Sequence, residues 1–225
     1  MQIKPNGFQG ILKLFSTLFL LFVFGYLLYL NNEVNKAFSK PAVNSSNTFS
    51  QTLVYEQHPK ALINMLLIIE DQSFFQHSGV DFKEIARVIR DYILHDKPIR
   101  GASTITQQLI KNTLLTPEQS FSRKIKEAIM AWMLEFSFTK EFILQRYMNS
   151  VYLGQKGNHE VRGFANAAEF YFHRQLDKLS LEEFATLVAL VKGPSFYHPI
   201  KYPNRLAKRK QLVLKLYTKY KKIVE

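Results

Sequence analysis

The strongest pattern in the chain is an uninterrupted apolar run near the N-terminus. No charge interrupts residues 14–30, and extension back to Ile11 gives about 20 residues, enough to cross a bilayer. No Ala-x-Ala cleavage pattern follows, so residues 11–30 are expected to be a retained anchor. Lys4 and Lys13 favour a cytoplasmic N-terminus at residues 1–10. Residues 31–52 are then predicted to be a polar tether, and residues 53–225 to form one domain.

Polar residues at capping positions mark the starts of helices in the rest of the chain. Asp81 is followed three residues later by Glu84, and Ser180 by Glu183, which is the spacing of a capping box. Each pair precedes a segment with apolar residues at helical spacing. Signals of the same kind predict further helix starts at Ser103, at Thr116-Pro117 with Gln119, at Thr139 and at Asn204.

Apolar periodicity predicts which helix faces are buried. The apolar run at residues 61–75 is too long for a typical strand and indicates a helix. No series of strands with hairpin signals follows, although a short β-ribbon near Val54 or Val151 fits the pattern, so the predicted fold class is mainly α. The stripes expected to face the core are Phe82, Ile85, Ile89 and Tyr92; Phe121, Ile125, Ile129, Trp132 and Phe136; and Leu206, Val213, Leu216 and Tyr220.

The charge balance narrows the class of partner. The net charge is +12, which indicates nucleic acid, an anionic membrane surface or a phosphate-bearing substrate. No RNA-binding signature or zinc-finger spacing supports nucleic acid. The chain has no cysteine, which excludes disulfides and thiolate metal sites. With 47% hydrophobic residues, the composition is that of a globular protein.

Two adjacent carboxylates, Glu70 and Asp71, stand at the end of a strongly apolar predicted helix. An apolar environment disfavours the charged form of a carboxyl group, which suits a general base. His77 follows, and Gly79 permits a turn before Asp81. One alternative is a polar helix end without chemistry. The other is a metal site made by both carboxylates and His77, which is disfavoured because adjacent residues on a helix point in different directions.

Two further clusters suit a phosphorylated ligand. Residues 101–108 have a glycine before a helix start, where free backbone N–H groups and the helix dipole suit a phosphate, and Lys111 follows on the same helix. Arg123 and Lys124 stand one turn before Glu127, where the cations keep the carboxylate ionised and can help to hold a diphosphate. The alternatives are an ordinary amphipathic helix for the first cluster and an exposed salt-bridge face for the second.

In this order and spacing, the clusters resemble the motifs of glycosyltransferase family 51. This is the peptidoglycan glycosyltransferase domain of class A penicillin-binding proteins and of monofunctional transglycosylases. The motif Glu-Asp-x-x-Phe-x-x-His-x-Gly is complete at residues 70–79, and Gly-x-Ser-Thr-Ile-x-Gln-Gln is complete at residues 101–108. Arg-Lys-x-x-Glu spans residues 123–127, and residues 140–149 and 209–214 are close to the fourth and fifth motifs. The resemblance covers residues 54–217.

The resemblance implies a lysozyme-like helical domain with a membrane-facing jaw, preceded by one transmembrane helix. The implied reaction is polymerisation of lipid II into β-1,4 glycan strands, with release of undecaprenyl diphosphate. Glu70 is implied as the catalytic base, and Glu127 as a second catalytic carboxylate near the diphosphate. The residues implied in substrate binding are Asp71, Phe74, His77, Ser103, Thr104, Gln107, Gln108, Lys111, Asn112, Arg123 and Lys124.

The implied partners are lipid II, lipid-linked glycan and the outer face of the bacterial cytoplasmic membrane. A transpeptidase or another cell-wall synthesis protein is a candidate partner, and no nucleic acid is implied. No organic cofactor is implied, and a divalent cation, Mg or Mn, near Glu127 is the candidate metal. The chain departs from the family pattern at Gln119, where a diphosphate-contacting Arg is common, and at Gln145, where Glu is common. A lysozyme-like enzyme that cleaves glycan and a non-catalytic scaffold for wall synthesis remain as alternatives.

Overall fold

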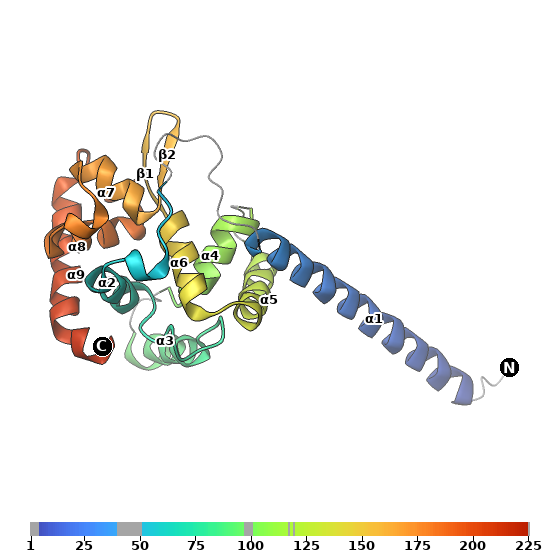
Figure 1. Ribbon diagram of the computed structural model, residues 1–225. Helices are drawn as coiled ribbons and strands as arrows, with labels where there is room; N and C mark the ends of the chain where they lie inside the picture. The colour runs from blue at the N-terminus through green and yellow to red at the C-terminus, as the bar shows by residue number, and fades with distance from the viewer. Residues whose placement is uncertain (1–4, 40–50, 97–100, 117, 119, 225) are drawn as a thin grey trace.

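The computed structural model describes residues 5–39, 51–96, 101–116, 118 and 120–224. Within these residues the chain is mainly helical, as the sequence predicts, with α1 projecting from a body that the other elements form (Figure 1). The elements in chain order are α1 (Pro5–Phe38), η1 (Tyr55–Gln57), α2 (Lys60–Glu70), α3 (Phe82–His95), α4 (Ile105–Leu114), α5 (Phe121–Ser137), α6 (Lys140–Ser150), β1 (Tyr152–Lys156), β2 (His159–Arg162), α7 (Phe164–Phe172), η2 (Leu176–Lys178), α8 (Leu181–Val191) and α9 (Pro203–Val224).

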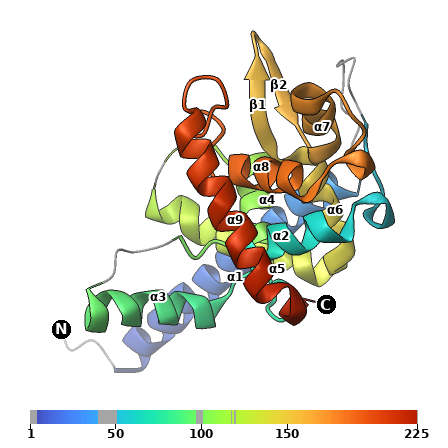
Figure 2. The ribbon, with the colours of Figure 1, turned by 90° about the vertical axis from the view of Figure 1, so that its left-hand side faces the viewer.

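Helix α2 is largely buried and carries Glu70 at its end. It packs against α8 and α9, and Figure 2 shows α9 crossing in front of α2 and α8. Burial of one large apolar side chain contributes about 1.5–3 kcal/mol, so α2 is firmly held and presents Glu70 at a fixed position. Its buried residues are Leu62, Ile63, Met65, Leu66, Leu67 and Ile68.

Several predicted helix starts are confirmed. Asp81 accepts a hydrogen bond of 2.8 Å from the Glu84 N–H and begins α3. Ser180 forms the predicted capping box of α8, and Thr139 caps α6. Helix α9 begins beside Asn204, and its predicted inward residues Leu206 and Val213 are buried.

Two helices begin elsewhere than predicted. The cap of α4 is Thr104 instead of Ser103, because the Ser103 hydroxyl accepts a hydrogen bond of 2.9 Å from Lys124. Helix α5 begins after Ser120 instead of at Thr116, and the Ser120 hydroxyl accepts from the Arg123 N–H. Two residues on which the predicted start of α5 rested, Pro117 and Gln119, lie outside the described residues.

The predicted inward stripes of α3 and α5 are wrong, because most of their residues face outward. No residue of α3 is buried, and Phe82 is 75% exposed. The residues that α5 buries are Glu127, Met130, Ala131, Met133 and Leu134. Its exposed apolar residues are Phe121, Ile125, Trp132 and Phe136. Periodicity locates an apolar face but does not say whether protein or lipid covers it, so the prediction chose the wrong face of α5.

Helix α1 is an apolar membrane-span candidate that continues into the body. Its segment Gln9–Phe38 is long and apolar enough to cross a bilayer. Leu30 and Val34, which are spaced by one helical turn, are fully buried where α1 packs on α5 and α4. The first part of the predicted tether is therefore helical and packed, whereas residues 40–50 lie outside the described residues.

Helix α6 holds the end of α1. Arg146 Nη2 donates a hydrogen bond of 3.2 Å to the Ala37 carbonyl, one of the carbonyls that the helix end leaves without a helical partner. The Arg146 guanidinium lies 5.6 Å from the Phe38 ring centroid. Phe38 is 2% exposed, so this end of α1 belongs to the core of the body.

A β-ribbon stands at one side of the body. Strands β1 and β2 pair antiparallel directly after Val151, one of the two predicted positions, whereas Val54 precedes η1. In the ribbon Tyr152 pairs with Arg162. Figure 2 shows the ribbon rising beside α7, away from α3.

Candidate active site

Glu70 is the last residue of α2, and the neighbouring helix α4 holds one of its carboxylate oxygens. Gln108 Nε2 donates a hydrogen bond of 3.0 Å to Glu70 Oε2. Tyr147 of α6 donates its hydroxyl proton to Gln108 Oε1 over 2.8 Å. The described residues make no hydrogen bond to Glu70 Oε1, and the side chain is partly exposed. Such a carboxylate can accept a proton from a bound hydroxyl group.

Tyr147 is a site residue that the sequence reasoning included only as part of a motif. Its side chain is fully buried. Burial raises the pKa of Tyr147 well above its usual value, and the negative charges of Glu70 and Asp71 act in the same direction. The hydroxyl therefore remains a proton donor throughout the neutral range.

Asp71 joins the end of α2 to the start of α4. Its Oδ2 accepts a hydrogen bond of 2.9 Å from the Ile105 N–H, and His77 Nε2 lies 3.0 Å from its Oδ1. Because a carboxylate only accepts, His77 donates from Nε2. The N–H groups of Thr104 and Gln107 are bonded within the α4 capping box. The prediction that free N–H groups at this helix start hold a phosphate is therefore wrong for these groups.

The turn after Asp71 closely approaches α5. Gly79 has a φ of 85°, and a Cβ there would lie 2.6 Å from the Ala131 carbonyl oxygen, so glycine is required. Thr104 Oγ1 donates a hydrogen bond of 2.6 Å to the Gly79 carbonyl. Phe74 of the same turn is 1% exposed and part of the core. These residues support the end of α2 that carries Glu70. Together with Asp71, His77, Ser103 and Gln107 they are called the frame.

An ion-pair network that the sequence reasoning missed supports the same turn. Lys140 Nζ lies 2.5 Å from Glu135 Oε2 and donates to the His77 carbonyl over 2.7 Å. Thr106 Oγ1 donates to Glu135 Oε1, also over 2.5 Å. Glu135 belongs to none of the motifs; Lys140, which opens the fourth motif, was the signal that could have pointed to this network.

Glu127 lies on the inner face of α5 and is 1% exposed. Arg123 Nη1 donates a hydrogen bond of 3.1 Å to Glu127 Oε2, and Lys124 Nζ bonds to Oε1. Lys124 also donates to the Ser103 hydroxyl. The alternative of an exposed salt-bridge face is wrong for this cluster, because the carboxylate is buried and draws both cations to one position.

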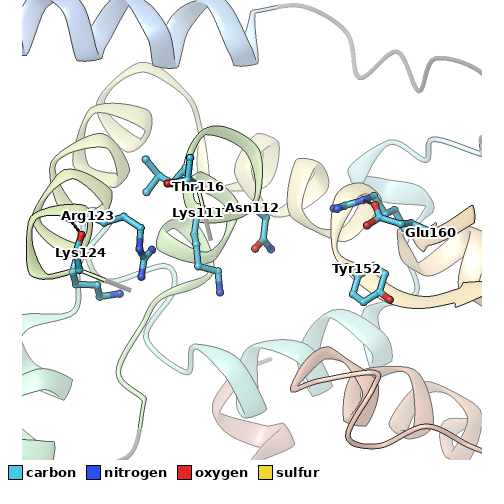
Figure 3. Close-up of a pocket in the computed structure, with 10 residues that line it drawn as sticks. Lys111, Asn112, Thr116, Arg123, Lys124, Tyr152 and Glu160 are labelled. Carbon is cyan, nitrogen blue, oxygen red and sulfur yellow. Dashed lines mark hydrogen bonds and ion pairs between the residues drawn. The ribbon is translucent and has the colours of Figure 1, made fainter. Parts of the chain in front are cut away.

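A cavity of about 730 Å³ lies between the α4–α5 pair and the β-ribbon. Figure 3 shows Lys111 and Asn112 from α4 and Arg123 and Lys124 from α5 along one side, with Tyr152 and Glu160 opposite. Arg162 completes the ribbon side. Cations outnumber the single carboxylate in this lining, so the cavity suits an anion.

Helix α4 connects Glu70 to this cavity. Glu70 and Glu127 do not line the cavity themselves. Gln108, which holds Glu70, lies three and four residues before Lys111 and Asn112, so all three side chains share one face of α4. The predicted site residues thus divide into the Glu70 carboxylate with the Gln108 amide that holds it, a buried frame, and a row of cavity-lining cations.

Comparison with known proteins agrees with these motifs. The family model described as Transglycosylase matches residues 37–218. The chain belongs to the transglycosylase family. It is similar to penicillin-binding protein 1B of Buchnera aphidicola subsp. Acyrthosiphon pisum, with 46% identity over 74% of this chain and 22% of that protein. It is also similar to penicillin-binding protein 1B of Escherichia coli (strain K12), with 43% identity over 70% of this chain and 19% of that protein. The chain thus spans about a fifth of the length of these relatives.

The residues near Glu127 in this transglycosylase chain do not fit a metal ion. Both carboxylate oxygens already bond to Arg123 and Lys124. Within the described residues, no three His, Asp or Glu side chains form a group that could hold a metal. The candidate divalent cation therefore has no protein site at Glu127.

Gln145, which departs from the transglycosylase motif, has a structural contact. Its Oε1 accepts a hydrogen bond of 3.0 Å from the Tyr55 N–H at the start of η1. A glutamine oxygen accepts this bond as a glutamate oxygen would. Asn149, one turn further along α6, holds Leu53 through two hydrogen bonds, so this face of α6 fastens the segment before α2. Gln119 lies outside the described residues.

Proposed function

We propose that this chain polymerises lipid II into peptidoglycan glycan strands and releases undecaprenyl diphosphate. One observation carries the proposal: the Glu70 carboxylate at the end of α2 is held through one oxygen by Gln108 of α4, whose face leads to a cavity lined by Lys111, Arg123 and Lys124. A base beside an anion site suits the transfer of a sugar from a diphosphate. Similarity to penicillin-binding proteins 1A and 1B is compatible with a role in wall synthesis.

Glu70 accepts the proton of the acceptor sugar's 4-hydroxyl group as its oxygen attacks the donor's anomeric carbon. The new glycosidic carbon–oxygen bond forms while the bond from that carbon to the diphosphate oxygen breaks. The leaving electron pair stays on the diphosphate, which departs as an anion. Charge therefore develops at the phosphate oxygens, where cation side chains lower the barrier most.

Lys111, Arg123 and Lys124 are the groups proposed to hold the donor diphosphate. All three line the cavity, and Asn112 adds an amide beside them. Glu127 keeps Arg123 and Lys124 in position through its buried carboxylate. Its proposed part is to position these cations, because its oxygens are already occupied by the two side chains.

The frame residues are proposed to act by position. Asp71, His77 and Gln107 make hydrogen bonds within the protein, and Phe74 and Thr104 are buried. Ser103 accepts from Lys124 and so fixes one diphosphate-binding cation. Removal of any of these groups would move Glu70 or a cation, and displacement of about 1 Å can cost about 100-fold in rate.

Two features support the proposed membrane placement, the apolar span of α1 and the exposed apolar residues of α3 and α5. We propose that α1 spans the cytoplasmic membrane with the N-terminus inside and the body at the outer face. The outward apolar residues of α3 and α5 then rest on the same bilayer, which would deliver both lipid-linked substrates to the cavity. A transpeptidase is a proposed partner, since the glycan product needs cross-linking.

The test is polymerisation of purified lipid II by the intact protein in lipid vesicles. Replacement Glu70→Gln is expected to lower the rate at least 100-fold, the usual range for loss of a general base. The control is Glu182→Gln, which removes an exposed carboxylate on α8 and is expected to retain the rate. Equal polymerisation by Glu70→Gln, or cleavage of preformed glycan without any synthesis, would contradict the proposal.

A further inference from the structure

Three helices meet at one short chain of hydrogen bonds. Tyr147 of α6 donates to Gln108 of α4 over 2.8 Å, and Gln108 donates to Glu70 of α2 over 3.0 Å. Tyr147 is fully buried, and its ring has no exposed edge toward a substrate. Its hydroxyl can therefore influence the reaction only through the side chains that it touches.

We propose that Tyr147 is a positioning residue that fixes the orientation of the Gln108 amide and so keeps Glu70 ready to accept a proton. The proposal rests on the proposed function of Glu70 as base. It adds a residue that neither contacts substrate nor lines the cavity.

The two ends of the Gln108 amide differ in the hydrogen bonds that they make. A glutamine side chain has one end that accepts and one that donates, and rotation by half a turn exchanges them. Tyr147 remains protonated because burial raises its pKa, so its hydroxyl donates to the oxygen end of Gln108. The NH₂ end is then turned to Glu70, where it stabilises the ionised carboxylate.

The ionised Glu70 carboxylate accepts only the NH₂ end, and without the Tyr147 hydroxyl the oxygen end of Gln108 loses the donor that anchors the amide in this position. A less firmly held amide would donate less effectively to Glu70, which disfavours the ionised carboxylate and favours the protonated one. A protonated Glu70 cannot accept the acceptor's proton. The loss would therefore appear in the catalytic step, and it would be greatest at low pH.

The other titratable groups around this chain of hydrogen bonds are already paired. Asp71 is paired with His77, and Glu135 with Lys140. None of these four groups hydrogen-bonds to the Tyr147 hydroxyl, so replacement of that hydroxyl leaves their pairing in place.

The experiment measures lipid II polymerisation by Tyr147→Phe over a range of pH. The ring, and thus the packing, is kept. We expect kcat to fall about tenfold on the acid side of the pH profile with KM unchanged, the size that a hydrogen bond to a charged group suggests, and the loss to be smaller near neutral pH. We also expect the acid-side pH of half-maximal activity to move upward.

The matched control is Tyr171→Phe. Tyr171 also donates a half-buried hydroxyl, to the Leu153 carbonyl over 2.9 Å, but it has no contact with Gln108. It should lose a comparable amount of thermal stability while the acid side of the pH profile stays unchanged. A second comparison uses Gln108→Leu, in which Tyr147→Phe should have no additional effect.

Three results would overturn the proposal. The first is that Tyr147→Phe has the kcat and pH profile of the wild type. The second is that its kcat is lowered equally at every pH. The third is that Tyr147→Phe lowers kcat as much in the Gln108→Leu protein as it does in the wild type. In each case an active wild type with an inactive Glu70→Gln variant would still support the proposed function. Failure of the wild type to polymerise lipid II would instead contradict the function itself.

Discussion

Helices α2 and α3 follow one another in the chain, yet their apolar residues lie in opposite environments. Leu66 is fully buried in α2, which packs against α8 and α9, whereas no residue of α3 is buried and Ile93 is 69% exposed. Helix α2 is apolar along most of its length, and α3 has apolar residues at helical spacing. An exposed apolar face of this kind usually marks a contact surface. The difference indicates that α2 is stabilised by protein packing, whereas the described protein leaves the apolar face of α3 uncovered, as the proposed contact with lipid requires.

The largest expected difference between α2 and α3 is in how much a substitution on each helix lowers the free energy of unfolding. We expect Leu66→Ala to lower the free energy of unfolding by about 2–5 kcal/mol, since it removes a buried side chain and leaves a cavity. Ile93→Ala, on the exposed face, should change it by no more than about 0.5 kcal/mol. Urea unfolding of both variants in the same detergent measures the difference. Equal losses would show that α3 packs against protein after all.

The outward stripe of α5 offers a direct probe of the lipid contact. Trp132 is the single tryptophan of the chain and is 56% exposed. We expect its emission to shift to shorter wavelength in vesicles, and brominated lipids to quench it severalfold more than an aqueous quencher does. Tryptophan favours the membrane interface, which is the physical reason.

The control for this experiment places the single tryptophan at another position. In Trp132→Phe carrying Lys210→Trp, the tryptophan lies on α9, where Lys210 is paired with Glu182 of α8. That protein should show the reverse preference between the two quenchers. Aqueous quenching of Trp132 as strong as that of the moved probe would remove α5 from the membrane surface.

Helix α1 has one segment that is buried in the body and another that is exposed and apolar, so the same comparison can be made within one helix. Val34 is fully buried in the body, and Phe22 is 71% exposed on the apolar span. We expect Val34→Ala to cost about 2 kcal/mol of unfolding free energy, from the lost apolar burial and the remaining cavity. Phe22→Leu should cost less than about 0.5 kcal/mol.

Amide hydrogen exchange would locate this effect. Val34→Ala should increase exchange in α5, against which this part of α1 packs, while α8 keeps its protection. An unchanged α5 would mean that the span is only tethered to the body, as the polar composition of residues 31–52 suggested.

The sequence predicted local features well because their causes are local. Capping at Asp81 and Ser180 depends on residues three positions apart, and both were confirmed. Lys111, Arg123 and Lys124 were recognised from motifs, and they share one cavity. The outward faces of α3 and α5 were missed because periodicity is the same toward lipid as toward protein.

The long-range contacts of the site could not be predicted in this way. Glu135 contacts Thr106 and Lys140, and Tyr147 reaches Glu70 through Gln108; these pairings come from packing of separate helices. The same limit explains Thr104, whose hydroxyl reaches the distant Gly79 carbonyl in addition to capping α4. A motif marks that a residue matters, but its partners follow from the fold.

The smallest expected effect is a loss of stability in mild acid that begins on the α2 side. His58, just before α2, is 3% exposed; its Nδ1 donates to the Val54 carbonyl, and its Nε2 is buried without a partner. Burial lowers the pKa of His58 below its ordinary 6.5, although two backbone contacts oppose the shift. The folded protein therefore binds this proton less readily than the unfolded chain.

For a lowered histidine pKa, the stabilisation of the folded protein is fully present above about pH 6.5. It is lost as the pH falls from there through the lower pKa of the folded state. Protonation would also create a buried Nε2–H donor with no acceptor, which is costly. We expect the free energy of unfolding to decline from pH 7.5 to pH 5 by less than the cost of Leu66→Ala, and His58→Gln to flatten the decline. Hydrogen exchange at pH 5 should rise in α2 before it changes in α8. An equal decline in His58→Gln would assign the acid sensitivity to other groups, and the contrast between α2 and α3 would then rest on apolar packing alone.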